Sequence, residues 1–158
     1  MIRKAQTQDI PRIAEIIVFG KRVAYRSIFN NDLVSFNELQ VMDLVEKYHS
    51  DLSLIDDMIV YDDGIVKGVI NRRYTNENVE LCEFYVEPFF KGNGIGRELI
   101  QYVINEAKNA HMKRIFFWVI KDNLSARKFY EANGFKESGE TCLIEGTTKW
   151  DMCYEKVL

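Results

Sequence analysis

A glycine-rich stretch between Val86 and Arg97 has the composition of an anion-binding turn and reads Val-Glu-Pro-Phe-Phe-Lys-Gly-Asn-Gly-Ile-Gly-Arg. Glycines at alternate positions let backbone amides approach an anion closely, and a following helix adds the partial positive charge of its N-terminus. The stretch lacks the Gly-Lys-Ser/Thr ending of a P-loop and the G-x-G-x-x-G spacing of a dinucleotide fold. It predicts a pyrophosphate cradle without nucleotide hydrolysis; a flexible loop is the alternative interpretation.

A second segment, from Asn123 to Phe135, reads Asn-Leu-Ser-Ala-Arg-Lys-Phe-Tyr-Glu-Ala-Asn-Gly-Phe and predicts a helix that ends at Gly134. Tyr130 follows Asn123 by about two helical turns, or about 10 Å of rise, so the two side chains share a face. Tyrosine hydroxyls stay protonated at neutral pH and can donate a proton to a developing anion. Tyr130 is therefore a candidate general acid, with a core aromatic ring as the alternative.

Other residue types that bind metals or react do not form a pattern. Cys82, Cys142 and Cys153 include no CxxC pair, so neither a disulfide framework nor a thiolate metal site is encoded. His49 and His111 have no partner at ligand spacing and are interpreted as surface residues. We expect no metal ion.

The composition indicates one globular domain, because 158 residues with 47% apolar and 13% aromatic side chains suffice for a single core. The 21 basic residues against 24 acidic ones argue against a general nucleic-acid binder. The longest apolar run, residues 115–120, is far shorter than the roughly 20 residues of a membrane span. The N-terminus lacks the apolar segment of a secretory signal. We expect a cytoplasmic protein without nucleic-acid or membrane partners.

Apolar spacing predicts the elements that position these residues. A strand at residues 2–5 precedes a helix whose buried face includes Ile10, Ile13, Ala14 and Ile17, and a capping-box pattern at 35–38 starts a second helix. The elements expected after these are strands at 55–61, 65–74 and 79–86, a helix to about residue 109, a strand at 115–120, a helix at 123–133, and strands at 135–140 and 150–157.

The 115–120 strand is apolar throughout, so we expect it to be covered on both faces. Phe116, Phe117 and Trp118 are accordingly predicted as core residues. For Trp150, a core position is favoured over a place in a pocket wall.

In the glycine-rich stretch and in the segment from Asn123 to Phe135, the chain resembles the GNAT superfamily of acetyl-CoA-dependent N-acetyltransferases. That family carries Arg/Gln-x-x-Gly-x-Gly/Ala after its fourth strand and Asn-x-x-Ala-x-x-x-Tyr-x-x-x-Gly-Phe around its last helix. Both patterns occur here about 30 residues apart, and the close resemblance covers residues 78–136. Lys91 stands where the family usually has Arg or Gln, which weakens a bidentate phosphate contact but leaves the backbone cradle intact.

The resemblance implies a single N-acetyltransferase domain over residues 1–158 with an α+β fold. Its mixed, mostly antiparallel sheet has about seven strands, the fourth and fifth splayed apart, and about four flanking helices. Acetyl-CoA is the implied cosubstrate, with pantetheine paired to the backbone of the fourth strand and pyrophosphate on the loop amides. The implied cofactor-binding residues are Phe84, Tyr85, Val86, Lys91, Gly92, Asn93, Gly94, Ile95, Gly96, Arg97, Asn123, Ala126 and Phe129.

Three of these assignments have an equally good structural explanation. Asn123 fits a helix N-cap, while Ala126 and Phe129 fall on the apolar face of their helix and would pack in the core.

In the family, a carboxylate on the fourth strand often takes the proton of the substrate ammonium, and Glu80 and Glu83 are both candidates here. Strand alternation places them on opposite faces unless a bulge intervenes. Glu83 is favoured because it lies nearer the splay, and a solvated surface carboxylate is the alternative for either residue.

The implied acceptor is a primary amine of a small molecule or peptide, bound around residues 25–36 and near the last two strands. A homodimer is compatible with this expectation. The rival functions are a non-catalytic acyl-CoA-binding sensor and an acyltransferase that uses another acyl chain or acceptor.

Overall fold

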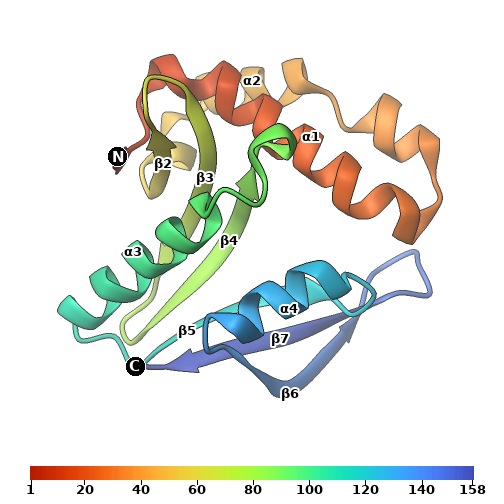
Figure 1. Cartoon of the computed structure of the whole chain (residues 1–158). Coiled ribbons are helices and arrows are strands. Elements are labelled where there is room, and N and C mark those ends of the chain that lie inside the picture. Colours follow the sequence, from red (N-terminus) through yellow and green to blue (C-terminus); the bar gives the residue numbers. More distant parts are fainter. The chain divides into compact units, whose positions relative to one another are not determined.

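The computed structural model describes residues 1–158 and contains one seven-stranded sheet with the order β1-β2-β3-β4-β5-β7-β6 (Figure 1). Strands β4 and β5 pair in parallel, whereas the β1–β2, β2–β3, β5–β7 and β6–β7 pairs are antiparallel. The predicted α+β class with a mixed, mostly antiparallel sheet is confirmed. The strands are β1 (Ile2–Lys4), β2 (Met58–Asp62), β3 (Val66–Tyr74), β4 (Asn78–Val86), β5 (Arg114–Ile120), β6 (Lys136–Leu143) and β7 (Trp150–Val157).

Four α-helices accompany the sheet, as the resemblance implied. They are α1 (Ile10–Phe29), α2 (Val41–Ser50), α3 (Ile95–Asn109) and α4 (Leu124–Ala132). Short helical turns connect them to the strands: η1 (Thr7–Asp9), η2 (Val34–Glu38), η3 (Leu52–Ile55) and η4 (Pro88–Phe90).

The chain forms two compact units. Unit 1 comprises residues 1–72 and 82–102, and unit 2 comprises residues 73–81 and 103–158. Strands β3 and β4 and helix α3 therefore each contribute residues to both units.

The core of unit 1 lies on both faces of β3. Val69 belongs to the apolar cluster that includes Ile13 and Ile17 of α1. The preceding residue, Gly68, faces α3, where a Cβ on this glycine would lie only 2.9 Å from the Leu99 side chain. Because neighbouring strand residues point to opposite faces, α1 and α3 cover the two sides of β3, and glycine permits the close approach of α3.

The core of unit 2 contains a group of aromatic rings between α4 and the strands β5 and β7. The Phe117 ring lies 4.0 Å from that of Tyr130, 5.2 Å from that of Phe135 and 6.0 Å from that of Tyr154, measured between centroids. These contacts place α4 against β5 and β7, as Figure 1 shows.

The segment at 35–38 does not start the second helix. It forms the separate turn η2, and α2 begins at Val41. Arg22 of α1 donates hydrogen bonds to the carbonyl oxygens of Ser35 and Leu39 at 2.8 and 2.7 Å. These hydrogen bonds from α1 hold the η2 segment as a turn that is separate from α2. The capping-box pattern therefore did not predict where the second helix begins.

Two tryptophan predictions are wrong. Trp118 is 41% exposed and Trp150 is 46% exposed, whereas Phe117 is buried and Phe116 is half-buried. The side chains of β5 alternate in burial at Phe116, Phe117 and Trp118, so its apolar run does not mean that both faces are covered. The strand expected at 55–61 also begins later, at Met58, because Ile55 lies in the turn η3.

Candidate active site

The glycine-rich stretch folds into η4, an open loop and the first turn of α3. Gly92 and Gly94 have φ angles of +85° and +81°, a region that non-glycine residues rarely adopt. Apart from the adjoining residues of the chain, no atom lies within 4 Å of a Cβ built on either glycine, so the space above the loop is open. The amide of Glu98 bonds to the Gly94 carbonyl oxygen at 3.0 Å, which makes Gly94 the last residue before the helix.

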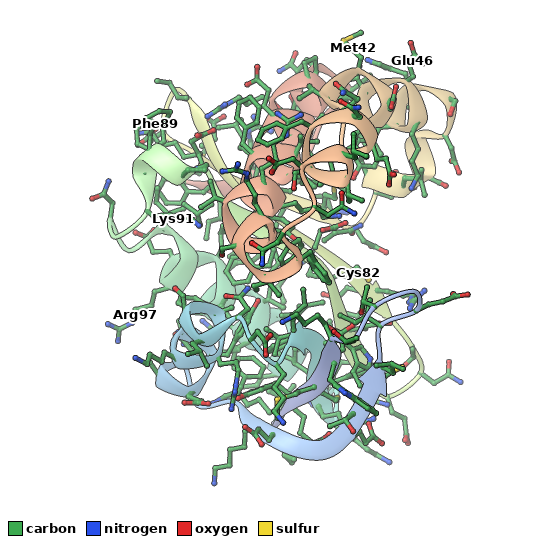
Figure 2. The ribbon with its side chains drawn as sticks, turned by 90° about the vertical axis from the view of Figure 1, so that its right-hand side faces the viewer. Met42, Glu46, Cys82, Phe89, Lys91 and Arg97 are labelled. Carbon is green, nitrogen blue, oxygen red and sulfur yellow. The ribbon has the colours of Figure 1, made fainter.

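This geometry suits an anion. The first amides of α3, those of Ile95, Gly96 and Arg97, precede the helical bonding pattern and carry the positive end of the helix dipole. Lys91 and Arg97 are exposed along the same loop and first turn (Figure 2). The residues present therefore fit a pyrophosphate group.

An ion pair between a half-buried arginine and a buried glutamate anchors the start of the loop. Glu87 is 3% exposed, and its Oε2 atom lies 2.9 Å from Arg12 Nη2, although the pair is not aligned as a hydrogen bond. The Glu87 amide also donates to the Lys67 carbonyl oxygen at 2.8 Å. These contacts tie the loop to α1 and β3, and sequence reasoning missed them because the partners are far apart in the chain.

Glu83 lies in the wall of a cavity of about 320 Å³ within unit 1. Its Oε1 atom accepts a hydrogen bond from Lys21 Nζ at 2.9 Å, and both side chains are about one quarter exposed. We call this space the Glu83 cavity. It is lined by residues of α1, the following loop, η2 and β4: Lys21, Tyr25, Phe29, Asn31, Val34, Ser35, Leu39, Cys82, Glu83 and Tyr85.

Two tyrosine side chains share the wall of this cavity with Glu83. The hydroxyl groups of Tyr25 and Tyr85 lie 2.9 Å apart, within hydrogen-bond distance. Burial raises the pKa of Tyr48, and the nearby negative charge of Glu83 raises it further. The side chain of Tyr85, which was predicted as a cofactor contact, lies in the wall of the Glu83 cavity. This cavity lies in the region around residues 25–36 where the acceptor was expected.

Glu80 has a different environment, in unit 2. Its carboxylate accepts a hydrogen bond from Arg73 Nε of the neighbouring strand at 3.0 Å, and Arg73 Nη2 contacts the same oxygen. Glu80 lines none of the described cavities, so the structure separates the two candidate bases by their surroundings.

The second predicted segment forms α4 in unit 2. The Asn123 side chain accepts a hydrogen bond from the Ala126 amide at 3.2 Å, which is the expected N-cap. Phe129 and Tyr130 are half-buried, with ring centroids 5.3 Å apart. Gly134 has a φ of +83°, as predicted for the end of this helix. Asn123 therefore acts as the N-cap of α4. The contacts of Asn123, Ala126 and Phe129 with a cofactor stay predictions.

A larger cavity of about 740 Å³ lies on another face of α1, lined by Phe19, Arg22, Val23, Arg26, Ser27, Asn30, Asp32 and Phe36. Its cations already have partners. Arg22 binds two backbone carbonyl groups, and Arg26 forms an ion pair with Asp32 at 2.7 Å. The charged side chains that line this cavity therefore all have partners within the protein.

The remaining histidine and cysteine side chains differ in their exposure. His49 and His111 are exposed, as expected. Cys82 and Cys142 are exposed and Cys153 is buried. No group of three potential metal ligands comes together, and no helix is long and apolar enough to cross a membrane.

The sequence model of the Acetyltransferase (GNAT) family matches residues 23–135. The chain therefore belongs to the GNAT acetyltransferase family.

Similarity to individual proteins is more limited. An uncharacterized N-acetyltransferase of Methanocaldococcus jannaschii is 39% identical over 61 residues, which is 39% of this chain and 27% of that protein. Spermidine N(1)-acetyltransferase of Thermoplasma acidophilum is 20% identical over 98% of this chain and 95% of its own length. The chain spans only 27% to 47% of the length of the first curated relatives it matches.

The fold is shared with solved structures. The crystal structure of PaiA N-acetyltransferase from Thermoplasma acidophilum, in complex with coenzyme A, has a TM-score of 0.76 with this chain at 20% identity. The match covers 100% of this chain and 98% of that one. The GNAT fold expected from the two motifs is therefore confirmed.

Proposed function

We propose that this chain transfers the acetyl group of acetyl-CoA to a primary amine of a small molecule or peptide. The observation that carries this proposal is the open loop at Gly92 and Gly94, which leads directly into the N-terminus of α3 in a chain of the GNAT family.

The residues of the loop would hold the pyrophosphate of the cosubstrate. Backbone amides from Lys91 to Gly96 would bind its oxygens, and Arg97 would add a positive charge. The backbone of Phe84 and Val86 would pair with pantetheine as with an added strand. When bound, acetyl-CoA supplies the activated acetyl group as a thioester. The contacts of Asn123, Ala126 and Phe129 with it are part of the same proposal.

Glu83 is the proposed base. The acceptor ammonium gives one proton to the Glu83 carboxylate, and the free amine attacks the acetyl carbon directly in a ternary complex. A C–N bond forms and the C–S bond breaks, with its electron pair going to sulfur. The Tyr130 hydroxyl is the proposed donor of the proton that the departing thiolate takes up. The second proton, which the nitrogen loses as the amide forms, then restores the Tyr130 hydroxyl through solvent.

The cavity location of Glu83 favours an enzyme over a non-catalytic acyl-CoA sensor. A sensor requires the glycine loop alone, whereas this chain also places a carboxylate and a lysine in the wall of a second, amine-sized space. A transferase for another acyl chain or acceptor would share these features, so the choice among acyl groups requires measurement.

The test is thiol release from acetyl-CoA in the presence of a panel of primary amines, with mass spectrometry of the products. We expect release that depends on the amine and matches the acetylated product in amount. Coenzyme A binding without amine-dependent release by any member of a broad panel would favour the sensor.

A further inference from the structure

The Glu83 cavity has a charge pattern that restricts the acceptor. Lys21 and Glu83 are the two ionisable residues of opposite charge in its wall, and they neutralise each other at 2.9 Å. The other lining side chains are uncharged at neutral pH. The cavity thus has no net charge and contains one matched cation–anion pair.

We propose that the acceptor of this site is a small amine that also carries a carboxylate, of the α-amino acid class. The inference rests on the proposed function, which it narrows. The ammonium group of such a ligand would bind Glu83, and its carboxylate would bind Lys21.

A zwitterion suits this wall because it preserves the charge balance. Its ammonium replaces Lys21 at Glu83, and its carboxylate gives the displaced Lys21 a new partner, so neither partly buried charge is left unpaired. The same exchange removes the lysine from the proposed base. Glu83 then faces the amine from which it must take a proton before that nitrogen attacks the acetyl carbon.

A polyamine fits this wall poorly. Each ammonium beyond the first would need its own anion, and the lining residues include no carboxylate other than Glu83. A simple monoamine would take Glu83 but leave Lys21 without its partner. The charge count therefore favours the amino acid over both.

Size and polarity agree with a ligand of this kind. A volume of about 320 Å³ lies at the small end of the roughly 300–1,000 Å³ range of ligand sites. Phe29, Val34 and Leu39 provide an apolar part of the wall, which suits an aliphatic side chain. The hydroxyl pair of Tyr25 and Tyr85 provides the polar part.

The test compares four amines that differ in charge: leucine, leucine methyl ester, leucinamide and spermidine. The ester and amide keep the amine and side chain but lack the carboxylate, and the amide also represents a peptide N-terminus. We expect kcat/KM for leucine to exceed that for the ester and the amide by about 10-fold or more. Equal or faster turnover of the amide or of spermidine would overturn the proposal.

The variant Lys21→Met then tests the assigned contact. The ratio of kcat/KM for leucine to that for its ester should fall towards one, and the KM for leucine should rise by about 10-fold. Lys47→Met removes an exposed lysine of α2 outside this cavity and should leave the ratio unchanged. An unchanged ratio in Lys21→Met would refute the role of Lys21.

Calorimetric titration of leucine and its ester into the protein without acetyl-CoA gives a readout independent of turnover. Tighter binding of leucine, lost in Lys21→Met, is the expected result. If leucine binds in this way and no amine is acetylated, the proposed transfer fails while the ligand class stands. If acetyl transfer is as fast or faster with amines that lack a carboxylate, the ligand class fails and the transfer stands.

Discussion

Glu83 is the acidic side chain of the Glu83 cavity, and its carboxylate is held in place by the ion pair with Lys21. Glu80 is held by Arg73 of the neighbouring strand instead. The two glutamates are the same residue type, but only Glu83 lies in the wall of a described cavity.

The variant Glu83→Gln should lower the rate of acetyl transfer most at low pH. The acceptor amine is then protonated and needs a base, whereas at high pH free amine is abundant. The measurement is kcat/KM against pH for the wild type and the variant. Glu80→Gln is the matched control and should follow the wild-type profile; a larger effect at Glu80 would reverse the assignment of the base.

Tyr130 is packed among aromatic rings, so its substitution can separate packing from proton donation. Tyr130→Phe keeps the ring and removes the hydroxyl group. Turnover should fall by about 10²-fold, while coenzyme A affinity and the melting temperature change little. Turnover close to wild type, under conditions in which chemistry limits the rate, would show that water or the amine protonates the sulfur.

At the scale of elements, a guanidinium group joins the start of α1 to two strands. Arg3 of β1 donates to Asp9 at 2.7 and 2.9 Å and to Asp62 of β2 at 3.0 and 2.8 Å. The hydrogen bonds from Arg3 lower the pKa of Asp9, although burial opposes this effect. Asp9 therefore stabilises the fold in its charged form.

The lowered pKa of Asp9 predicts how the stability of the fold changes as the pH falls. Because the folded-state pKa of Asp9 lies below its unfolded value, the stabilisation is complete above about pH 5 and is lost as the pH falls through the folded value. Asp9→Asn should lower the free energy of unfolding by about 1.5–3 kcal/mol at pH 7. Urea denaturation should show this difference shrinking as the pH falls below the unfolded value of about 4; a difference that stays constant from pH 7 to pH 2 would contradict the charge-based explanation.

For the whole molecule, the proposal of a single domain rests on the elements that both units share. Residues of β3, β4 and α3 belong to each unit, so unfolding of one unit would break an element of the other. We expect one cooperative thermal transition, with far-UV and near-UV circular dichroism changing at the same temperature. Two resolved transitions would show that the units unfold separately.

The fold was predictable from the sequence where local patterns determine the structure. The helical spacing that includes Ile13 and Ile17 marks the buried face of α1, and Gly134 has the positive φ angle expected at a helix end. The loop at Gly92 and Gly94 was predictable for the same reason. Patterns of this kind depend on backbone conformation and not on distant partners.

The sequence was less informative where contacts between residues far apart in the chain determine the structure. The bonds of Arg22 to the η2 segment changed a helix start, and the exposure of Trp118 depends on which face of β5 is covered. Lys21 was missed as a site residue because it lies 62 positions from Glu83 and belongs to no motif. A helix lysine one turn before Tyr25 was the only local signal available.

Binding of coenzyme A through the glycine loop is the claim on which the account depends, and a thermal melt tests it directly. At a concentration about 100-fold above its Kd, coenzyme A should raise the melting temperature of the wild type by about 5–10 °C, with or without EDTA. Gly94→Val introduces a branched side chain at a φ of +81° and should abolish the shift, whereas Gly64→Val carries similar strain at +102° in the β2–β3 turn and should keep it. A wild-type melt unmoved by millimolar coenzyme A, or a normal shift in Gly94→Val, would contradict the account.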